Sequence, residues 1–294
     1  MQNYDNSNDN SQSKRGELSV RNSDTIAIIL LAGIGRRMQH ELPKSLIPFE
    51  INGEEVTFIE RLLHVLGKAG VSHFILVVNS HNFAYFKHLE SSYISLVVNQ
   101  SDVSSTGSSL SLNYGLDKLR ASVSKEMPHL LIMDGDIIFE QRLANFVVDF
   151  NAGSALFVTP NISEDEEEVR VYLQNQQPKL IGKGITSEIS KNLYLAGESL
   201  GIIKLCPDDL PLLHSLTTWL CGSPSNPKAF GYARQKSEHE EIWQYFFNLE
   251  RLIVVSVAKD LVFSECDSLE DREHINEVVL PKILVNDKRI FAHS

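Results

Sequence analysis

Apolar residues along this chain gather in short blocks, and two kinds of block alternate. Continuous apolar runs, which are typical of strands buried in a parallel sheet, occur at 26–31, 74–78, 96–98 and 130–133. Segments in which apolar positions have helical spacing lie between them, at 58–70 and 108–119. Strand, helix and strand therefore repeat through the first half, which predicts a doubly wound, mainly parallel sheet.

The second half has a less regular pattern. Further strands are expected at 155–159, 169–173, 179–181, 199–205, 252–257 and 261–263. Helices are expected at 207–217, 240–248 and 269–279. No internal repeat is visible, and the Pro- and Ser-rich stretch 222–228 is interpreted as a loop. We expect one α/β domain over 24–294 with a mixed sheet, after a disordered polar tail over 1–23 that has too few apolar residues to fold.

Composition narrows the classes of function. The chain has 294 residues and a formal net charge of -11, which argues against a nucleic-acid partner because such proteins usually carry a basic stripe. No apolar run approaches the length of a membrane span, and the N-terminus does not resemble a signal peptide, so we expect a cytoplasmic protein without a membrane partner. The three cysteines are far apart in the sequence and indicate neither a disulfide framework nor a zinc site.

A glycine-rich loop follows the first predicted strand. The sequence LLAGIGRRM covers 30–38 and is followed by LPKSL at 42–46. Glycines after a strand let backbone N–H groups approach phosphate oxygens, and the nearby Arg37 and Lys44 can neutralise a triphosphate. The loop lacks the GK[ST] of a Walker A motif and the third glycine of a dinucleotide fingerprint. We expect the nucleotide to be contacted by Leu31, Ala32, Gly33, Ile34 and Gly35.

A pair of carboxylates stands at the end of another predicted strand. Asp134 and Asp136 flank a glycine just after the apolar run 130–133. In open α/β sheets ligands bind outside the carboxyl ends of the strands, and carboxylate oxygens suit a hard divalent cation. A plain strand-to-helix turn is the alternative interpretation of this short stretch.

The two motifs together resemble the signature LAAGxGxRM…PKxLxP of the nucleotidyltransferase superfamily. That superfamily includes sugar-1-phosphate nucleotidylyltransferases and phosphocholine or phosphonate cytidylyltransferases. Leu31 departs from it, because a small residue is usual before Ala32. The resemblance implies a Rossmann-like, nucleotide-diphospho-sugar transferase-type fold, Mg²⁺ as the cofactor and a homodimer. It extends over about 26–275.

The resemblance also implies a metal site. In the family the second Asp of the DGD-like motif contacts Mg²⁺, and that position is Asp136; Asp134 is a further candidate ligand. The stretch FSECDSLED at 263–271 is similar to a family pattern close to EIDTPEDL, whose Asp is the other metal ligand, and Asp267 takes that position. A group of N-cap residues at the start of a helix is the alternative interpretation there.

Three weaker stretches complete the comparison with the family. Thr106, Gly107 and Ser108 stand where the family contacts the base and sugar, although a simple helix N-cap would explain them too. Lys183 resembles a lysine near the acceptor phosphate, with an exposed hairpin lysine as the alternative. Glu198, in GESLGIIK, would face the acceptor and pair with a cationic ammonium group; this stretch favours the cytidylyltransferase branch.

The resemblance therefore implies Mg²⁺-dependent transfer of a nucleotidyl group, with CTP as the expected donor, to a small phosphate or phosphonate acceptor with release of pyrophosphate. Arg37, Lys44 and Lys183 are the expected catalytic cations. The alternatives are a sugar-1-phosphate nucleotidylyltransferase and a nucleotide-binding protein without catalysis.

Overall fold

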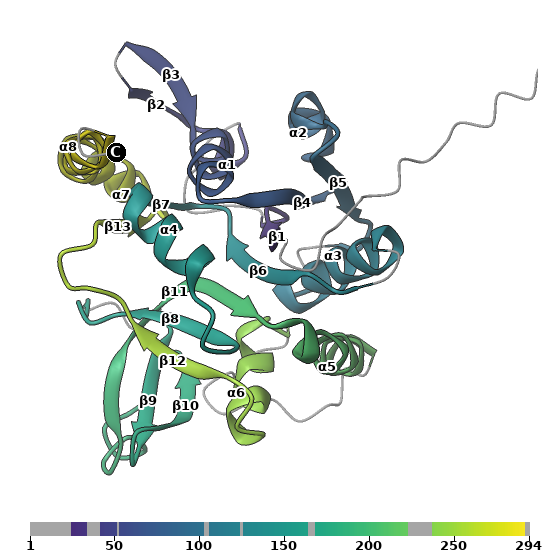
Figure 1. Cartoon of the computed structure of the whole chain (residues 1–294), viewed down its shortest axis with the longest axis vertical. Helices are drawn as coiled ribbons and strands as arrows, with labels where there is room; N and C mark the ends of the chain where they lie inside the picture. Colours follow the sequence, from purple (N-terminus) through teal and green to yellow (C-terminus); the bar gives the residue numbers. More distant parts are fainter. Residues whose placement is uncertain are drawn as a thin grey trace, which may run out of the picture.

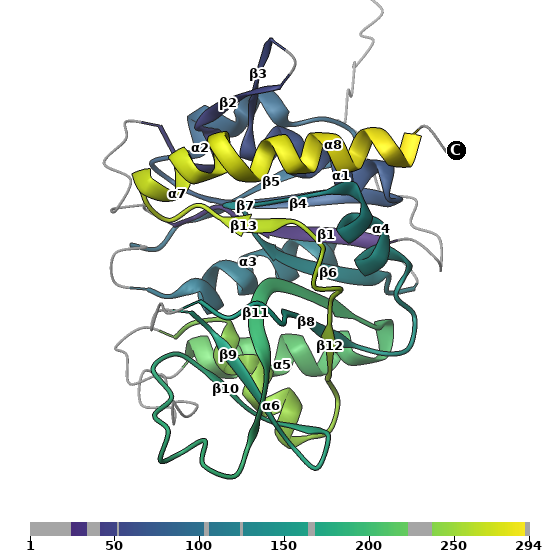
Figure 2. The same cartoon turned by 90° about the vertical axis from the view of Figure 1, so that its left-hand side faces the viewer.

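The computed structural model describes residues 25–33, 42–51, 53–102, 106–123, 126–163, 168–222 and 237–291. Figures 1 and 2 show two orthogonal views. The strands are β1 (Thr25–Leu30), β2 (Pro48–Ile51), β3 (Glu54–Thr57), β4 (Val71–Asn79), β5 (Ile94–Asn99), β6 (His129–Asp134), β7 (Ile137–Phe139), β8 (Ala155–Thr159), β9 (Arg170–Gln174), β10 (Gln177–Gly182), β11 (Tyr194–Leu205), β12 (Ile253–Ser256) and β13 (Phe263–Glu265). The helices are α1 (Phe58–Lys68), α2 (Phe83–Phe86), α3 (Ser108–Ser122), α4 (Gln141–Asp149), α5 (Leu210–Gly222), α6 (Glu240–Asn248), α7 (Leu269–His274) and α8 (Leu280–Phe291), with short turns η2 (Lys44–Leu46), η3 (Lys87–Leu89), η4 (Pro207–Asp209) and the π-helical η5 (Ile275–Val279).

A nine-stranded mixed sheet forms the centre of the molecule. Its main path runs β10-β9-β11-β6-β1-β4-β5. Off this path, β8 pairs with β11, and β12 pairs with β8. The strands β6, β1, β4 and β5 are parallel, whereas β11 is antiparallel to β6. The predicted α/β class with a doubly wound, mixed and mainly parallel sheet is therefore confirmed.

Alternation along β1 explains how the two faces of the sheet are covered. Ala27 and Ile29 belong to one apolar cluster, which packs under α1 and α4. Ile26 and Ile28 belong to a second cluster, which packs under α3, α5 and α6. Because successive side chains of a strand point to opposite faces, a continuous apolar run is what a strand covered on both faces requires. Figure 1 shows α1 and α3 on opposite sides of the sheet.

The last part of the chain differs from the sequence expectation. The sequence predicts that a helix ends at residue 279, but in the structure the helical segment continues to Phe291. It consists of α7, the π-helical turn η5 and α8. Pro281 explains the wider turn, because proline has no N–H and its ring collides with the carbonyl four residues earlier in a regular α-helix. Figure 2 shows α7 and α8 as one rod beside β7 and β13.

The prediction of a strand at 261–263 is shifted by two residues. Leu261 instead closes a turn, because its N–H donates to the carbonyl of Ala258 at 3.0 Å, and β13 begins at Phe263. Within the described residues, no helix combines the length and the apolar character needed to cross a bilayer.

Candidate functional site

A short antiparallel ladder brings together acidic residues that are far apart in the sequence. Strand β7 follows Asp136 directly, and β13 pairs with it so that Glu265 stands opposite Ile137. The N–H of Cys266 then donates to the carbonyl of Asp136 at 2.9 Å. Because side chains alternate along an extended chain, Glu265 and Asp267 point to one side while Cys266 points into an apolar cluster on the other.

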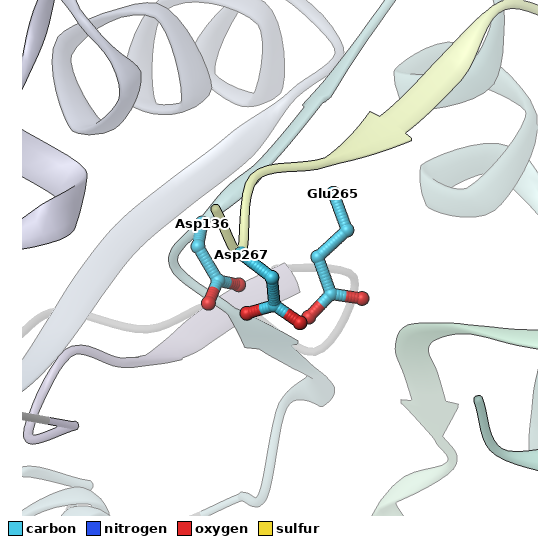
Figure 3. A group of neighbouring side chains, drawn as sticks. All are labelled: Asp136, Glu265 and Asp267. Atoms are coloured by element: carbon cyan, nitrogen blue, oxygen red, sulfur yellow. The ribbon is translucent and has the colours of Figure 1, made fainter. Parts of the chain in front are cut away.

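The result is a group of three carboxylates. Asp136, Glu265 and Asp267 each offer an oxygen, and these oxygens lie within 4.8 Å of one another. Figure 3 shows the three side chains directed toward the same space, Asp136 from the segment after β6 and the other two from the end of β13. The spacing suits one hard divalent cation.

Local structure holds the backbone of this group in place. The carboxylate of Asp271 accepts hydrogen bonds from the N–H of Asp267 at 2.9 Å and the N–H of Ser268 at 2.7 Å. Ser268 completes a capping box at the start of α7. At the other strand, Gly135 is packed so closely that an added Cβ would collide with the side chain of Leu31.

Lys44 lies between two of the carboxylates. Its Nζ donates to Oδ2 of Asp136 at 2.6 Å and also to Oδ1 of Asp267. Burial by itself would lower the pKa of Lys44, but the charges of Asp136 and Asp267 outweigh it and raise the pKa. Lys44, which the sequence predicts to contact the triphosphate, is therefore bonded to Asp136 and Asp267, the two predicted metal ligands.

Two further carboxyl groups are electrostatically unusual. Burial, then the charges of Asp136 and Asp267, raise the pKa of Glu265 well above its ordinary value. Burial raises the pKa of Asp134 to about 7, against the opposing effect of His239. Asp134 lies outside the three-carboxylate group, and its Oδ2 would stand 2.6 Å from a Cβ added to Gly201, so the carboxylate occupies the space beside that glycine.

A buried oxygen of Asp136 provides a second reason to place a divalent cation at this group of carboxylates. Oδ1 of Asp136 is buried and has no hydrogen-bond partner in the described structure. An unsatisfied buried carboxylate oxygen is costly, and a cation bound there would satisfy it. Asp136, Asp267 and Glu265 are therefore the candidate ligands; the last was not anticipated from the sequence, although its two-residue spacing from Asp267 in a strand was a usable signal.

A cavity of about 280 Å³ adjoins the carboxylates and collects the predicted nucleotide-binding residues. Leu31 is the exception among the described ones, because its side chain is buried in the core cluster under α1 and α4. Ile34, Gly35 and Arg37 lie outside the described residues. The cavity is lined by Leu30, Ala32, Gly33, Thr106, Gly107, Ser108, Ser111, Asp134, Asp136 and Glu238.

The far wall of this cavity is a junction between α3 and the segment before α6. Glu238 accepts hydrogen bonds from both the N–H and the hydroxyl of Ser108, at 3.0 and 2.8 Å. The N–H of Ser109 donates to the carbonyl of Ser237 at 3.2 Å. A Cβ on Gly107 would overlap that carbonyl, so the junction requires a glycine there.

A second cavity, of about 400 Å³, opens on the other side of Glu265 and Asp267. Glu198 lines it and accepts from the N–H and hydroxyl of Ser163, at 2.7 and 3.1 Å. Its described lining contains five carboxylates and neither lysine nor arginine: Glu168, Glu198, Glu265, Asp267 and Asp271. Lys183 lines a small adjoining cavity of about 50 Å³, together with Asp134 and His239.

Solved structures share this fold at low sequence identity. The inositol-1-phosphate CTP transferase from T. maritima superposes with a TM-score of 0.63 at 18% identity, covering 89% of this chain and 96% of that one. The CTP:phosphocholine cytidylyltransferase from Streptococcus pneumoniae gives 0.61 at 18% identity, covering 87% and 99%. A Bacillus anthracis protein assigned as a glucose-1-phosphate thymidylyltransferase gives 0.62 at 13% identity, covering 87% and 95%.

No curated protein matches the sequence. The model of one protein family does, over residues 27–199, which is more than half of the chain and includes the glycine-rich loop, Asp136 and Glu198. On this match and on the arrangement of loop, strand ends and carboxylates, the chain belongs to the family of MobA-like NTP transferase domains.

Proposed function

We propose that the protein transfers a cytidylyl group from CTP to a small phosphate or phosphonate acceptor that also carries a cationic group, with Mg²⁺ as the cofactor and pyrophosphate as the second product. One observation carries the proposal. The carboxylate group of Asp136, Glu265 and Asp267 lies between two cavities, one beside the glycine-rich loop and one with an acidic lining. That arrangement suits two substrates that react across a shared cation.

The chemistry makes mainly electrostatic demands. An oxygen of the acceptor phosphate forms a bond to the α-phosphorus while the bond from that phosphorus to the bridging oxygen breaks, and pyrophosphate leaves with the electron pair. The acceptor is already ionised at neutral pH, so no strong general base is needed. The site has to align two anions and neutralise their charge.

The residues divide this task between them. Mg²⁺ held by Asp136, Asp267 and Glu265 would supply positive charge at the reacting phosphates. Lys44, which lies beside Asp136, would stabilise the triphosphate and the departing pyrophosphate. Arg37 is assigned the same role on the family resemblance alone. Lys183, on the acceptor side, would neutralise the acceptor phosphate.

The acidic cavity supports a cationic acceptor. Five carboxylates line it, and the guanidinium of Arg170 stands 3.9 Å from one of them, Glu198. The lining remains negative, so it attracts an ammonium group and repels a second anion. Lys183 lines the small adjoining cavity, which shares Glu265 and Asp267 with the larger one. An acceptor with a phosphate or phosphonate at one end and an ammonium at the other, such as phosphocholine or aminoethylphosphonate, matches both ends. CTP as donor is supported by the stretch around Glu198, which is similar to that of cytidylyltransferases.

Pyrophosphate release tests the proposal. The purified protein would be assayed with Mg²⁺, each of the four NTPs, and a panel of phosphocholine, aminoethylphosphonate, a hydroxyalkylphosphonate and sugar 1-phosphates. We expect turnover with CTP and a cationic acceptor. Turnover only with a sugar 1-phosphate would favour the alternative function, that of a sugar-1-phosphate nucleotidylyltransferase. The Bacillus anthracis protein with the same fold is assigned to that class. NTP binding without turnover on any acceptor would indicate a protein that binds but does not react.

A single variant tests the acceptor assignment. Glu198→Gln removes one negative charge from the acidic cavity while the amide oxygen can still accept from Ser163. We expect KM for the cationic acceptor to rise about tenfold, with kcat and KM for CTP little changed. Equal effects on the cationic acceptor and on the neutral-tailed hydroxyalkylphosphonate would contradict a role for Glu198 in binding the ammonium.

A further inference from the structure

Glu238 lines the nucleotide cavity from a distant part of the chain. It stands 130 residues after Ser108, outside the matched family region 27–199, and the sequence gives no local signal for a role. Its carboxylate nevertheless reaches the first turn of α3, next to Thr106 and Gly107. The cavity wall therefore includes both the start of α3 and the segment before α6.

The geometry of this wall changes what it offers to a ligand. Both donors of Ser108, the backbone N–H and the hydroxyl, are bonded to Oε2 of Glu238 at 3.0 and 2.8 Å. The hydroxyl of Ser108 in turn accepts from the N–H of His239 at 2.8 Å. Ser108 was expected to contact the nucleotide, but both of its donors are bonded to Glu238. The wall therefore presents a carboxylate, which only accepts hydrogen bonds.

The position of the carboxylate also fixes which end of the nucleotide can lie there. Phosphate oxygens beside Glu238 would meet a like charge, whereas Asp136 is paired with Lys44 and is a candidate ligand of a divalent cation. The phosphates are better placed beside Gly33 and Asp136, which line the same cavity. The nucleoside then faces Glu238. A carboxylate has about four acceptor positions, so it can hold Ser108 and still accept from a ligand.

We propose that Glu238 is a specificity-determining residue, which accepts a hydrogen bond from a donor on the nucleoside of the bound NTP. Two groups carry such a donor: the exocyclic amine of cytosine or adenine, and a ribose hydroxyl. Uracil and hypoxanthine present a carbonyl at the position of that amine, and a carbonyl oxygen would face the carboxylate unfavourably. This inference rests on the proposed function, because it takes the cavity to be the nucleotide site.

Nucleotide affinities measured without an acceptor test the idea. Titration calorimetry in the presence of Mg²⁺ would compare CTP with UTP, ATP with ITP, and CTP with its 2′-deoxy and 3′-deoxy forms. The variants are Glu238→Gln, which keeps an acceptor for Ser108 but replaces the second oxygen by an amino group, and Glu238→Asp, which keeps the charge. Glu90→Gln, at an exposed glutamate, is the matched control.

Each outcome is decisive. We expect Glu238→Gln to reduce one preference by about tenfold or more: amine over carbonyl if the base is read, or hydroxyl over deoxy if the ribose is read. Glu238→Asp should retain that preference with weaker affinity overall. A common loss of affinity for every nucleotide, with all ratios unchanged, would mean that Glu238 only caps α3, and the inference would be wrong. If the wild-type protein binds none of these nucleotides, the proposed function fails together with it.

Discussion

The position of Lys44 leads to a prediction about metal binding. Its ammonium is bonded to Asp136 and Asp267, two of the three carboxylates that are candidate metal ligands. A divalent cation and this ammonium would therefore compete for the same oxygens. The substitution Lys44→Gln removes the charge and keeps a polar side chain of similar length. We expect it to tighten the binding of Mn²⁺ or Mg²⁺ to the protein when no nucleotide is present.

The magnitude follows from Coulomb's law. Nζ lies 2.6 Å from the nearest oxygen of Asp136, and an ion bound to the same carboxylates would stand about 4 Å from it. The repulsion between a divalent and a single charge at that distance is about 2 kcal/mol in a dielectric like water and about 8 kcal/mol at an effective value of 20. The carboxylates of Asp136 and Asp267 are partly exposed to solvent, so the lower figure applies. It corresponds to about a 30-fold lower Kd in Lys44→Gln.

The assay is a titration with Mn²⁺, in which the electron paramagnetic resonance signal of the free ion reports the bound fraction. Lys87→Gln, at an exposed lysine of η3, controls for a general change in net charge. The same Lys44→Gln protein should lose pyrophosphate release, since the lysine is expected on the triphosphate during turnover. An unchanged or higher Kd for Mn²⁺ in Lys44→Gln would show that the ammonium and the metal do not share these carboxylates, and the assignment of the site would have to be revised.

Three other predictions follow. Asp136→Asn should lower kcat/KM about 10²–10³-fold with an unchanged circular dichroism spectrum, and near-normal pyrophosphate release would remove this residue from the metal site. Gly107→Ala should lower the free energy of unfolding by about 1–3 kcal/mol, because its Cβ overlaps the carbonyl of Ser237; Gly67→Ala, in an open helical position of α1, should raise it by up to about 1 kcal/mol, and equal melting temperatures for the two variants would refute the reasoning. Burial raises the pKa of Asp134 to about 7. In the absence of metal, the folded protein therefore keeps this proton up to a higher pH than the unfolded chain does. The free energy of unfolding should therefore fall as pH rises from about 4 to 7 and then level off. Urea unfolding with a chelator measures it, and Asp134→Asn should reduce this fall by on the order of a few kcal/mol. Identical pH profiles for the variant and the wild-type protein would contradict the assignment.

The sequence predicts those parts of the site that depend on local pattern. A continuous apolar run ending in glycines identifies β1 and its loop, and the apolar run before Asp134 identifies β6. Parallel neighbours end at the same edge of a sheet, which is why Gly33 and Asp136 line the same cavity. Lys44, which the sequence predicts to contact the triphosphate, is bonded to a carboxylate at this edge, and its role stays a prediction.

Two site residues escape local reasoning for different physical reasons. Glu265 was missed because the strand was expected two residues too early; with β13 at Phe263–Glu265, alternation alone would have put Glu265 on the side of Asp267. Glu238 depends on a contact across 130 residues between two helix starts, and no periodicity along the chain encodes such a pair. Pairings of this kind are determined by how the elements pack.

The ladder between β7 and β13 also determines when the site can first exist. During synthesis the chain emerges from its N-terminal end, so the glycine-rich loop, Lys44 and Asp136 appear early and can fold around β1 and β6. Glu265 and Asp267 arrive only with the last strand, which pairs with β7. A chain that has reached only β12 therefore carries one of the three candidate metal ligands, Asp136. On the proposed function, metal binding at this site therefore depends on the pairing of β13 with β7, and a fragment without β13 should not turn over nucleotide.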